Sequence, residues 1–320
     1  MKRTWTLGVR LFVSAIIVGC VLVGSGWAAE VWVTNMKSAN VQVFDPASHK
    51  VVATIPADKG AHNVTFSRDG KLAFIANVGA NNVTIIDAVQ KKALGNVEAG
   101  TRAHHVAVSP NGKVAVVSNP GSGDITLIDV AQKKAVHTMP TGKGAMMAVF
   151  SRDGKEVFVA NAGDANVSVV DVKTHKEIQT LPAGKGVMAF EPTKDRKLAW
   201  LTGPDEDKVI ILNPTTGERV AAIDVPGEPH GMILSPNGKS AYVVQRKLNQ
   251  LAIIDTASRK ITKTAPVGKR PDMLALGPGG KTLYVTSRDD NKLLVVSAKD
   301  LKVTAEVATG EEPHGVAYRK

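Results

Sequence analysis

Histidine, methionine and aspartate recur in one column of this sequence, at intervals of 42 residues. The members of this column are His62, His104, Met146, Met188, His230, Asp272 and His314. Imidazole suits zinc and copper, thioether sulfur suits copper(I), and a carboxylate orients an imidazole ring. The column therefore predicts a metal site, with copper as its cofactor and His62, His104 and His314 as principal ligands. The structural alternative is that the histidines bond to backbone and the methionines fill space.

Positive charges gather just before this column and in three later loops. The positions concerned are Lys59, Arg102, Lys143, Lys185, Arg246, Lys247, Lys269, Arg270 and Arg288. Basic side chains around one rim favour an anionic ligand or nucleic acid, and the net charge of +11 agrees with such partners. The alternative is a solvated charged rim. The loops that hold Asp205-Glu206-Asp207, Arg246-Lys247 and Arg288-Asp289 depart from the other copies, and a departure from a repeat is where we expect a partner site.

Motifs for catalysis are missing from the sequence. There is no G-x-S-x-G nucleophile elbow, no H-E-x-x-H pair and no Walker loop. Five aspartates recur at one position, where we expect them to cap turns: Asp45, Asp87, Asp129, Asp171 and Asp255. Four asparagines recur at another, where we expect them to bond to turn backbone: Asn35, Asn77, Asn119 and Asn161. We predict no catalytic residue, and enzymatic activity is the less favoured interpretation.

These columns exist because the chain is a repeat. From Glu30, six full periods of 42 residues follow without insertion or deletion, and a shorter seventh ends at Lys320. In the second copy, strand-like runs cover 72–76, 82–87, 91–97 and 104–108, with turn residues between them. Four short strands per period are typical of a propeller blade. We predict an all-β fold over residues 29–320: a seven-bladed β-propeller of four-stranded antiparallel blades.

The frame of the repeat also predicts how the ring closes. The first copy begins at a second strand, and the chain ends in a first strand. We expect the strand over 314–318 to pair with the strand over 31–35, which hides two sheet edges that would otherwise be open.

The amino-acid sequences of the repeats resemble those of the YVTN family of exported propellers. The resemblance rests on Val31-Trp32-Val33-Thr34-Asn35, Tyr284-Val285-Thr286-Ser287 and Pro313-His314-Gly315-Val316-Ala317, and it spans residues 30–320. It implies the propeller fold. It implies no single function, because the family is broad.

Residues 1–28 have a different composition. Lys2, Arg3 and Arg10 precede an apolar run over 11–23, and Gly26-Trp27-Ala28 is a cleavage pattern. This order predicts a secretory signal, a periplasmic or secreted protein and no transmembrane segment in the mature chain. Cys20, the single cysteine, follows Ile17-Val18-Gly19 as in a lipobox. Lipid anchoring through Cys20 and an uncleaved N-terminal anchor are the alternatives.

From these features we expect an exported, monomeric, non-enzymatic binding or scaffold protein. Its rim around the central channel would take a protein partner or an anionic ligand. One alternative is a copper- or other metal-binding, redox-associated protein that uses the His/Met column. The other is an anion or nucleic-acid binder that uses the basic rim.

Overall fold

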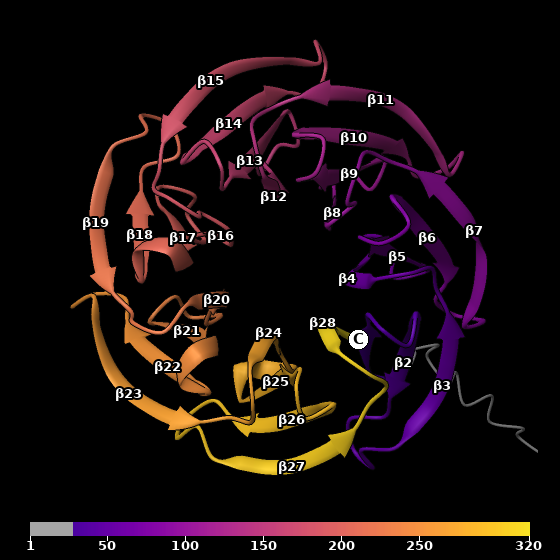
Figure 1. Ribbon diagram of the computed structural model, residues 1–320, viewed down its shortest axis with the longest axis vertical. Coiled ribbons are helices and arrows are strands. Elements are labelled where there is room, and N and C mark those ends of the chain that lie inside the picture. The colour runs from indigo at the N-terminus through magenta and orange to yellow at the C-terminus, as the bar shows by residue number, and fades with distance from the viewer. Residues whose placement is uncertain (1–27) are drawn as a thin grey trace, which may run out of the picture.

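The computed structural model describes residues 28–320, which form seven four-stranded sheets arranged as a ring (Figure 1). Strands next to one another in a sheet run antiparallel, as the pairing of β5 (Leu72–Asn77) with β6 (Asn82–Asp87) illustrates. The prediction of a seven-bladed β-propeller is confirmed. The predicted signal and Cys20 lie outside the described residues, apart from Ala28. Within 28–320, no helix has the length and apolar character needed to cross a membrane.

Each blade runs from an innermost strand at the channel to an outer strand at the circumference (Figure 1). The innermost strands are β28 (Pro313–Arg319), β4 (Ala61–Phe66), β8 (His105–Val108), β12 (Ala145–Phe150), β16 (Phe190–Pro192), β20 (Pro229–Leu234) and β24 (Pro271–Leu276). The second strands are β1 (Glu30–Asn35), β5, β9 (Val114–Asn119), β13 (Glu156–Asn161), β17 (Ala199–Gly203), β21 (Ser240–Gln245) and β25 (Thr282–Ser287).

The third strands are β2 (Asn40–Phe44), β6, β10 (Asp124–Asp129), β14 (Asn166–Asp171), β18 (Lys208–Leu212), β22 (Gln250–Asp255) and β26 (Lys292–Ser297). The outer strands are β3 (Val51–Pro56), β7 (Lys92–Glu98), β11 (Lys134–Pro140), β15 (Lys176–Pro182), β19 (Arg219–Asp224), β23 (Lys260–Pro266) and β27 (Val303–Ala308). Short 3-10 turns stand at η1 (Pro204–Glu206), η2 (Arg246–Leu248) and η3 (Pro278–Gly280).

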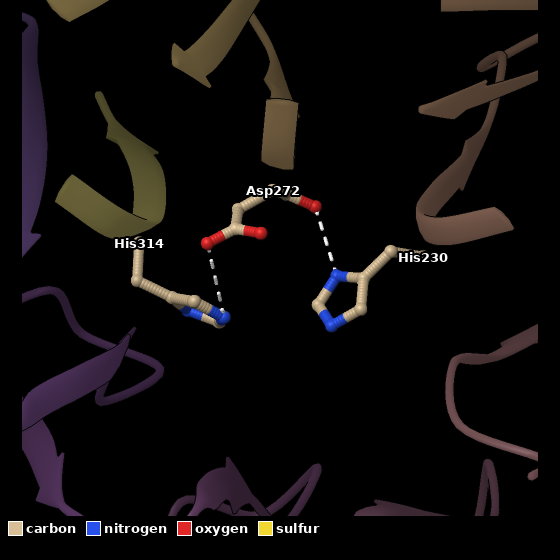
Figure 2. A group of neighbouring side chains, drawn as sticks. All are labelled: His230, Asp272 and His314. Carbon is tan, nitrogen blue, oxygen red and sulfur yellow. Dashed lines mark hydrogen bonds and ion pairs between the residues drawn. The ribbon is translucent and has the colours of Figure 1, made fainter. Parts of the chain in front are cut away.

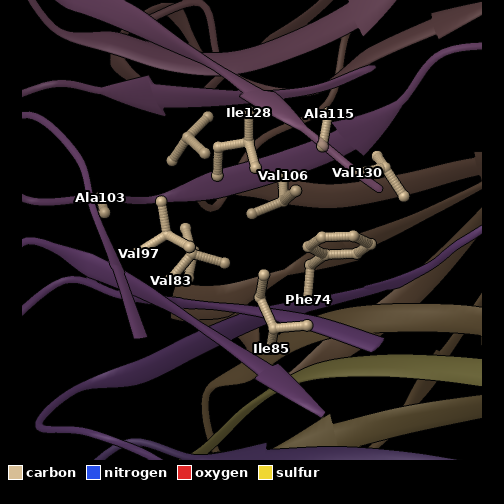
Figure 3. Packing of buried hydrophobic residues seen from close by; sticks show 11 residues of the cluster. Phe74, Val83, Ile85, Val97, Ala103, Val106, Ala115, Ile128 and Val130 are labelled. Atoms are coloured by element: carbon tan, nitrogen blue, oxygen red, sulfur yellow. The ribbon is translucent and has the colours of Figure 1, made fainter. Parts of the chain in front are cut away.

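The core lies between neighbouring blades. In Figure 3, Phe74 and Ile85 of one blade pack against Val106 and Ile128 of the next, and each of these side chains is at most 1% exposed. A strand held between two other blades buries both faces, which explains its continuous apolar run. Each large side chain buried in this way contributes about 1.5–3 kcal/mol.

The ring closes as the sequence predicts. Strand β28 pairs with β1, with Val31 opposite Tyr318 and Trp32 opposite Ala317. A buried ion pair reinforces this joint, since Arg319 Nη1 lies 2.8 Å from Glu30 Oε2. Lys91 Nζ from the next blade lies 2.7 Å from the other oxygen of Glu30. The last strand of the chain therefore completes a blade that three N-terminal strands begin.

Candidate functional site

The His/Met/Asp column lies at the beginning of the innermost strands, around one mouth of the channel. His62, His230, Asp272 and His314 lie within β4, β20, β24 and β28, and His104 directly precedes β8; all five are buried. The ring of His62 stacks on that of His314 with 3.6 Å between centroids, and it lies 4.1 Å from the ring of His104. The repeat therefore brings together side chains that are far apart in the sequence.

Each of these histidines bonds to the blade that follows it. The Nδ1 atom of His62 lies 3.1 Å from the carbonyl oxygen of His104, and Nδ1 of His104 lies 2.7 Å from that of Met146. His230 bonds to the oxygen of Asp272 at 3.0 Å, and His314 to that of His62 at 3.1 Å. A carbonyl oxygen only accepts, so each Nδ1 carries the proton. The lone pair of each Nε2 is then left free for chemistry.

Small and hydroxylated residues hold these histidines in place. A Cβ atom added to Gly231 would lie 2.6 Å from the carbonyl oxygen of Asp272, so glycine is required after His230. Gly315, after His314, meets the carbonyl oxygen of His62 in the same way. The hydroxyl of Thr286 donates to the oxygen of His314 at 2.7 Å. This packing explains the His-Gly pairs of the sequence.

Asp272 stands at the centre of a charged cluster. Its carboxylate contacts Nη2 of Arg246 and lies 3.5 Å from Nη1 of Arg288. Arg246 also pairs with Glu228, and Arg288 with Glu312. Figure 2 shows the carboxylate of Asp272 directed at His314, 3.8 Å from its Nε2 atom, while its backbone oxygen faces His230. The Nε atom of Arg246 is buried and has no hydrogen-bond partner among residues 28–320.

Burial controls the ionisation of the cluster. It lowers the pKa of His104 to about 4 and takes the pKa values of His230 and His314 well below 6.5. The positive charge of Arg246 adds to that effect on both residues. Burial raises the pKa of Asp272, and the facing guanidiniums act in the opposite direction. At neutral pH the site therefore offers neutral imidazoles beside cationic guanidiniums.

A cavity of about 30 Å³ lies among these side chains. That is enough for about one water molecule. Beside the histidines, its walls include His105, Met147, Met188 and Met273, whereas Met146 is not among them. Met273 was missed by the sequence analysis, and the signal was available: the column one residue further along also holds His105 and Met147.

Three members of the His/Met/Asp column lie close enough together to share an ion. Ligand atoms of His230, Asp272 and His314 all lie within 4.8 Å of one another. The guanidiniums of Arg246 and Arg288 already face the carboxylate of Asp272, and they would repel a divalent cation. Copper binding by His62, His104 and His314 stays a prediction.

The predicted basic rim divides into two groups. Six of its cations are exposed: Lys59, Arg102, Lys143, Lys185, Lys269 and Arg270. Lys247 is exposed as well, with its Nζ 3.9 Å from Glu228. Arg246 and Arg288 are instead 11% and 18% exposed and converge on Asp272. The loop over 205–207 contributes to local structure, because Glu206 accepts a hydrogen bond from the backbone N–H of Lys185. Two of the three departing loops therefore build the cluster.

The repeated asparagines are structural, but their predicted partners were wrong. Asn77 Nδ2 donates to the side chains of Asn82 and Thr84, both at 2.9 Å, and not to turn backbone. Asn119 bonds in the same way to Asp124 and Thr126. The repeated aspartates do cap turns as predicted: Asp87 accepts two backbone N–H groups.

Comparison with protein families gives one match. The family described as "Lactonase, 7-bladed beta-propeller" matches residues 80–314. The match supports the propeller, while the narrower YVTN resemblance is not confirmed. It overturns the expectation of a non-enzymatic binding or scaffold protein, because the family is named for an enzyme activity. No curated protein sequence matches the chain.

Solved structures of similar shape extend over most of the chain. The periplasmic gluconolactonase PpgL of Pseudomonas aeruginosa is 18% identical, covering 91% of this chain and 99% of its own, with a TM-score of 0.77. A putative 6-phosphogluconolactonase of Bacteroides fragilis is 16% identical over 92% and 98%, with a TM-score of 0.78. Hydrazine synthase of Kuenenia stuttgartiensis is 20% identical over 83% and 91%, with a TM-score of 0.75. These likenesses establish the fold alone.

Proposed function

The chain belongs to the seven-bladed β-propeller lactonase family, and on that premise we propose that it hydrolyses a lactone at the Asp272 cluster. Two observations support this location. The cluster joins neutral imidazoles to guanidiniums in one buried place. It is also built by loops that depart from the repeat, where we expect a specific activity to reside.

Lactone hydrolysis needs a base that takes a proton from water. His314 suits this role because its Nδ1 proton is engaged by the carbonyl oxygen of His62, which leaves Nε2 as an acceptor. A water molecule between Nε2 of His314 and Oδ2 of Asp272, which are 3.8 Å apart, would donate one hydrogen bond to each, and Nε2 would take one proton from it as its oxygen attacks the lactone carbonyl. Asp272 would also stabilise the imidazolium that forms when the water attacks.

The reaction also needs a donor for the oxyanion that forms at the lactone carbonyl. The unpaired Nε–H of Arg246 is such a donor, and a lactone would reach it only when the side chains that line the cavity of about 30 Å³ move apart to admit the ring. Removing one oxyanion donor typically lowers kcat by about 100–1,000-fold. Asp272 positions both guanidiniums, so its role is electrostatic as well as orienting.

The direct test is lactone hydrolysis by the purified protein. δ-Gluconolactone is the first substrate to try, because the similar structure from P. aeruginosa is a gluconolactonase; γ-butyrolactone provides a five-membered ring without hydroxyls. Proton release at constant pH would report turnover. We expect Arg246→Ala to lower kcat by about 100-fold, and Lys247→Ala, next to it but exposed, to leave it unchanged. A rate no greater than that of the uncatalysed reaction for every lactone would refute the proposal.

A further inference from the structure

A second hollow lies at the opposite end of the innermost strands. It has a volume of about 970 Å³ and lies between the blade of β16–β19 and the blade of β20–β23. Its walls include Glu191, Lys194, Lys197, Trp200 and Arg259. The Asp272 cluster lies where innermost strands begin, and this hollow lies where they end. The two places are therefore on different faces of the ring.

Glu191 breaks the repeat at this place. Its equivalents in the other copies are all uncharged: Thr65, Ala107, Val149, Ile233, Ala275 and Ala317. Glu191 lies opposite Trp200 in the pair β16–β17 and is partly buried. No hydrogen bond or ion pair of its carboxyl group is found in the described part of the chain. A carboxyl group in such a place lowers stability unless something binds it.

The backbone near Glu191 is also unusual. Arg196 has a φ of 61°, where Gly70, Gly112, Gly154 and Gly238 have the same left-handed conformation. Such a conformation costs a residue other than glycine about 1–2 kcal/mol. Strand β16 has three residues, fewer than any other strand of the structure over 28–320. Glu191, Arg196 and the short strand β16 are three departures from the repeat at one place, and such a place is where we expect a specific site.

The charges of the hollow favour an anion. Lys194, Lys197 and Arg259 contribute three positive charges, while Asp195 is engaged in its own turn through Thr193 and the backbone of Lys197. Arg196 is directed away, with Nη1 3.3 Å from the backbone oxygen of Phe150 in the preceding blade. A protonated carboxyl of Glu191 would complete the site, because it donates a hydrogen bond to an anionic oxygen.

We propose that this hollow is a binding site for a small organic anion. The protonated carboxyl group of Glu191 donates a hydrogen bond to the anion, and Lys197 supplies a positive charge. The site is separate from the Asp272 cluster and does not depend on the proposed hydrolysis. Carboxylates and phosphate esters share the chemistry required.

The protonation of Glu191 makes this binding depend on pH. Burial raises the pKa of Glu191 to about 7, although the positive charge of Arg196 opposes the rise. The other charged groups near it are Lys194, Asp195, Lys197 and Arg259, together with Arg152, which acts on Arg196. Below pH 7 the protonated form accommodates an anion, and above pH 7 the carboxylate repels it. Linkage to one proton predicts affinity about tenfold weaker at about pH 8 than at about pH 6.

Calorimetric titration of the purified protein with D-gluconate, and separately with inorganic phosphate, tests the site. We expect one anion to bind per chain at about pH 6, and binding to weaken about tenfold at about pH 8. Glu191→Gln retains a donor and cannot ionise, so its affinity for D-gluconate, which stays fully ionised over this range, should be the same at both pH values. Binding of gluconate alone would assign a carboxylate, and binding of phosphate would assign a phosphate ester; both support the site.

The repeat supplies a matched control. Lys71 is the equivalent of Lys197 and lines a similar hollow of about 760 Å³ between the blades of β4–β7 and β8–β11, where no acid replaces Thr65. Lys197→Ala should weaken binding several-fold, and Lys71→Ala should not. Neither variant, nor Glu191→Gln, should change lactone hydrolysis. Absence of binding at about pH 6, an equal loss in Lys71→Ala, or a pH dependence of D-gluconate binding that persists in Glu191→Gln would overturn the proposal.

Discussion

The Nδ1 atom of His314 lies 3.1 Å from the backbone oxygen of His62, although 252 residues separate them in the sequence. The bond joins the blade that β28 completes to the blade of β4–β7, and it continues the series from His62 to His104 and from His104 to Met146. Each donor and acceptor occupy equivalent positions in neighbouring blades. A constant repeat length therefore fixes four imidazoles in one tautomer around the channel.

Acid should destabilise the fold through these buried histidines. Burial lowers the pKa of His104 from 6.5 to about 4, so the unfolded chain takes up the proton first as the pH falls. Neutral His104 makes its full contribution to the free energy of unfolding above pH 6.5. About 3 kcal/mol of that contribution is lost as the pH falls to 4. Urea unfolding at several pH values should show a shallower dependence for His104→Gln than for the wild type. His175→Gln, at an exposed position, should match the wild type; equal slopes for all three proteins would contradict this account.

Asp272 should be necessary for the stability of the hub. Asp272→Asn removes the charge that faces Arg246 and Arg288. Breaking a buried ion pair from one side costs about 3–5 kcal/mol, because the partner's charge remains. Asp289→Asn, one residue after Arg288 and exposed, is the control and should have little effect. Equal stability of the two variants in denaturant unfolding would show that the guanidiniums do not depend on Asp272.

Thr286 should position His314 without touching a substrate. Its hydroxyl donates to the backbone oxygen of His314 at 2.7 Å. Thr286→Val keeps the shape but loses this bond, and we expect it to cost about 1 kcal/mol of stability and to lower kcat more than it raises KM. Thr286→Ser should restore both. An unchanged kcat in Thr286→Val would show that Thr286 does not position His314 for catalysis.

Glu30 should hold the ring closed. Its carboxylate accepts from Trp32 and Arg319 and pairs with Lys91. Glu30→Ala leaves Arg319 buried without this partner, and we expect a loss of about 3–5 kcal/mol. Glu156 occupies the same repeat position and has no ion pair in the part of the chain described, so Glu156→Ala should change the free energy of unfolding by well under that amount. Similar losses in both variants would mean that Glu30 has no special role in closure.

The fold was predictable because its information is repeated. Strand pattern, blade number and the pairing of β28 with β1 all follow from one period of 42 residues. The column from His62 to His314 was found in the same way. The pairing of Arg246 and Arg288 with Asp272 was not, because the conformations of two loops in different blades decide it. Glu191 was missed because its neighbours Phe190 and Pro192 continue the apolar pattern of the innermost strands.

The identity of the chemistry was also beyond the sequence patterns. Lactone hydrolysis has no short motif comparable to a nucleophile elbow, and the base and the oxyanion donor that we propose, His314 and Arg246, lie in different blades. The histidines were therefore interpreted as metal ligands. A neutral imidazole with a free Nε2 serves equally as a ligand or as a base, and residue types alone do not distinguish the two roles.

The most direct test is the rate of δ-gluconolactone hydrolysis by the wild type, His314→Gln and His137→Gln. His137 lies on β11, which is the outer strand of its blade, whereas the channel is lined by the innermost strands. We expect turnover by the wild type and by His137→Gln, and a kcat about 100–10,000-fold lower for His314→Gln, as for loss of a general base. Equal rates for the three proteins, or no turnover by any of them, would contradict catalysis at the Asp272 cluster.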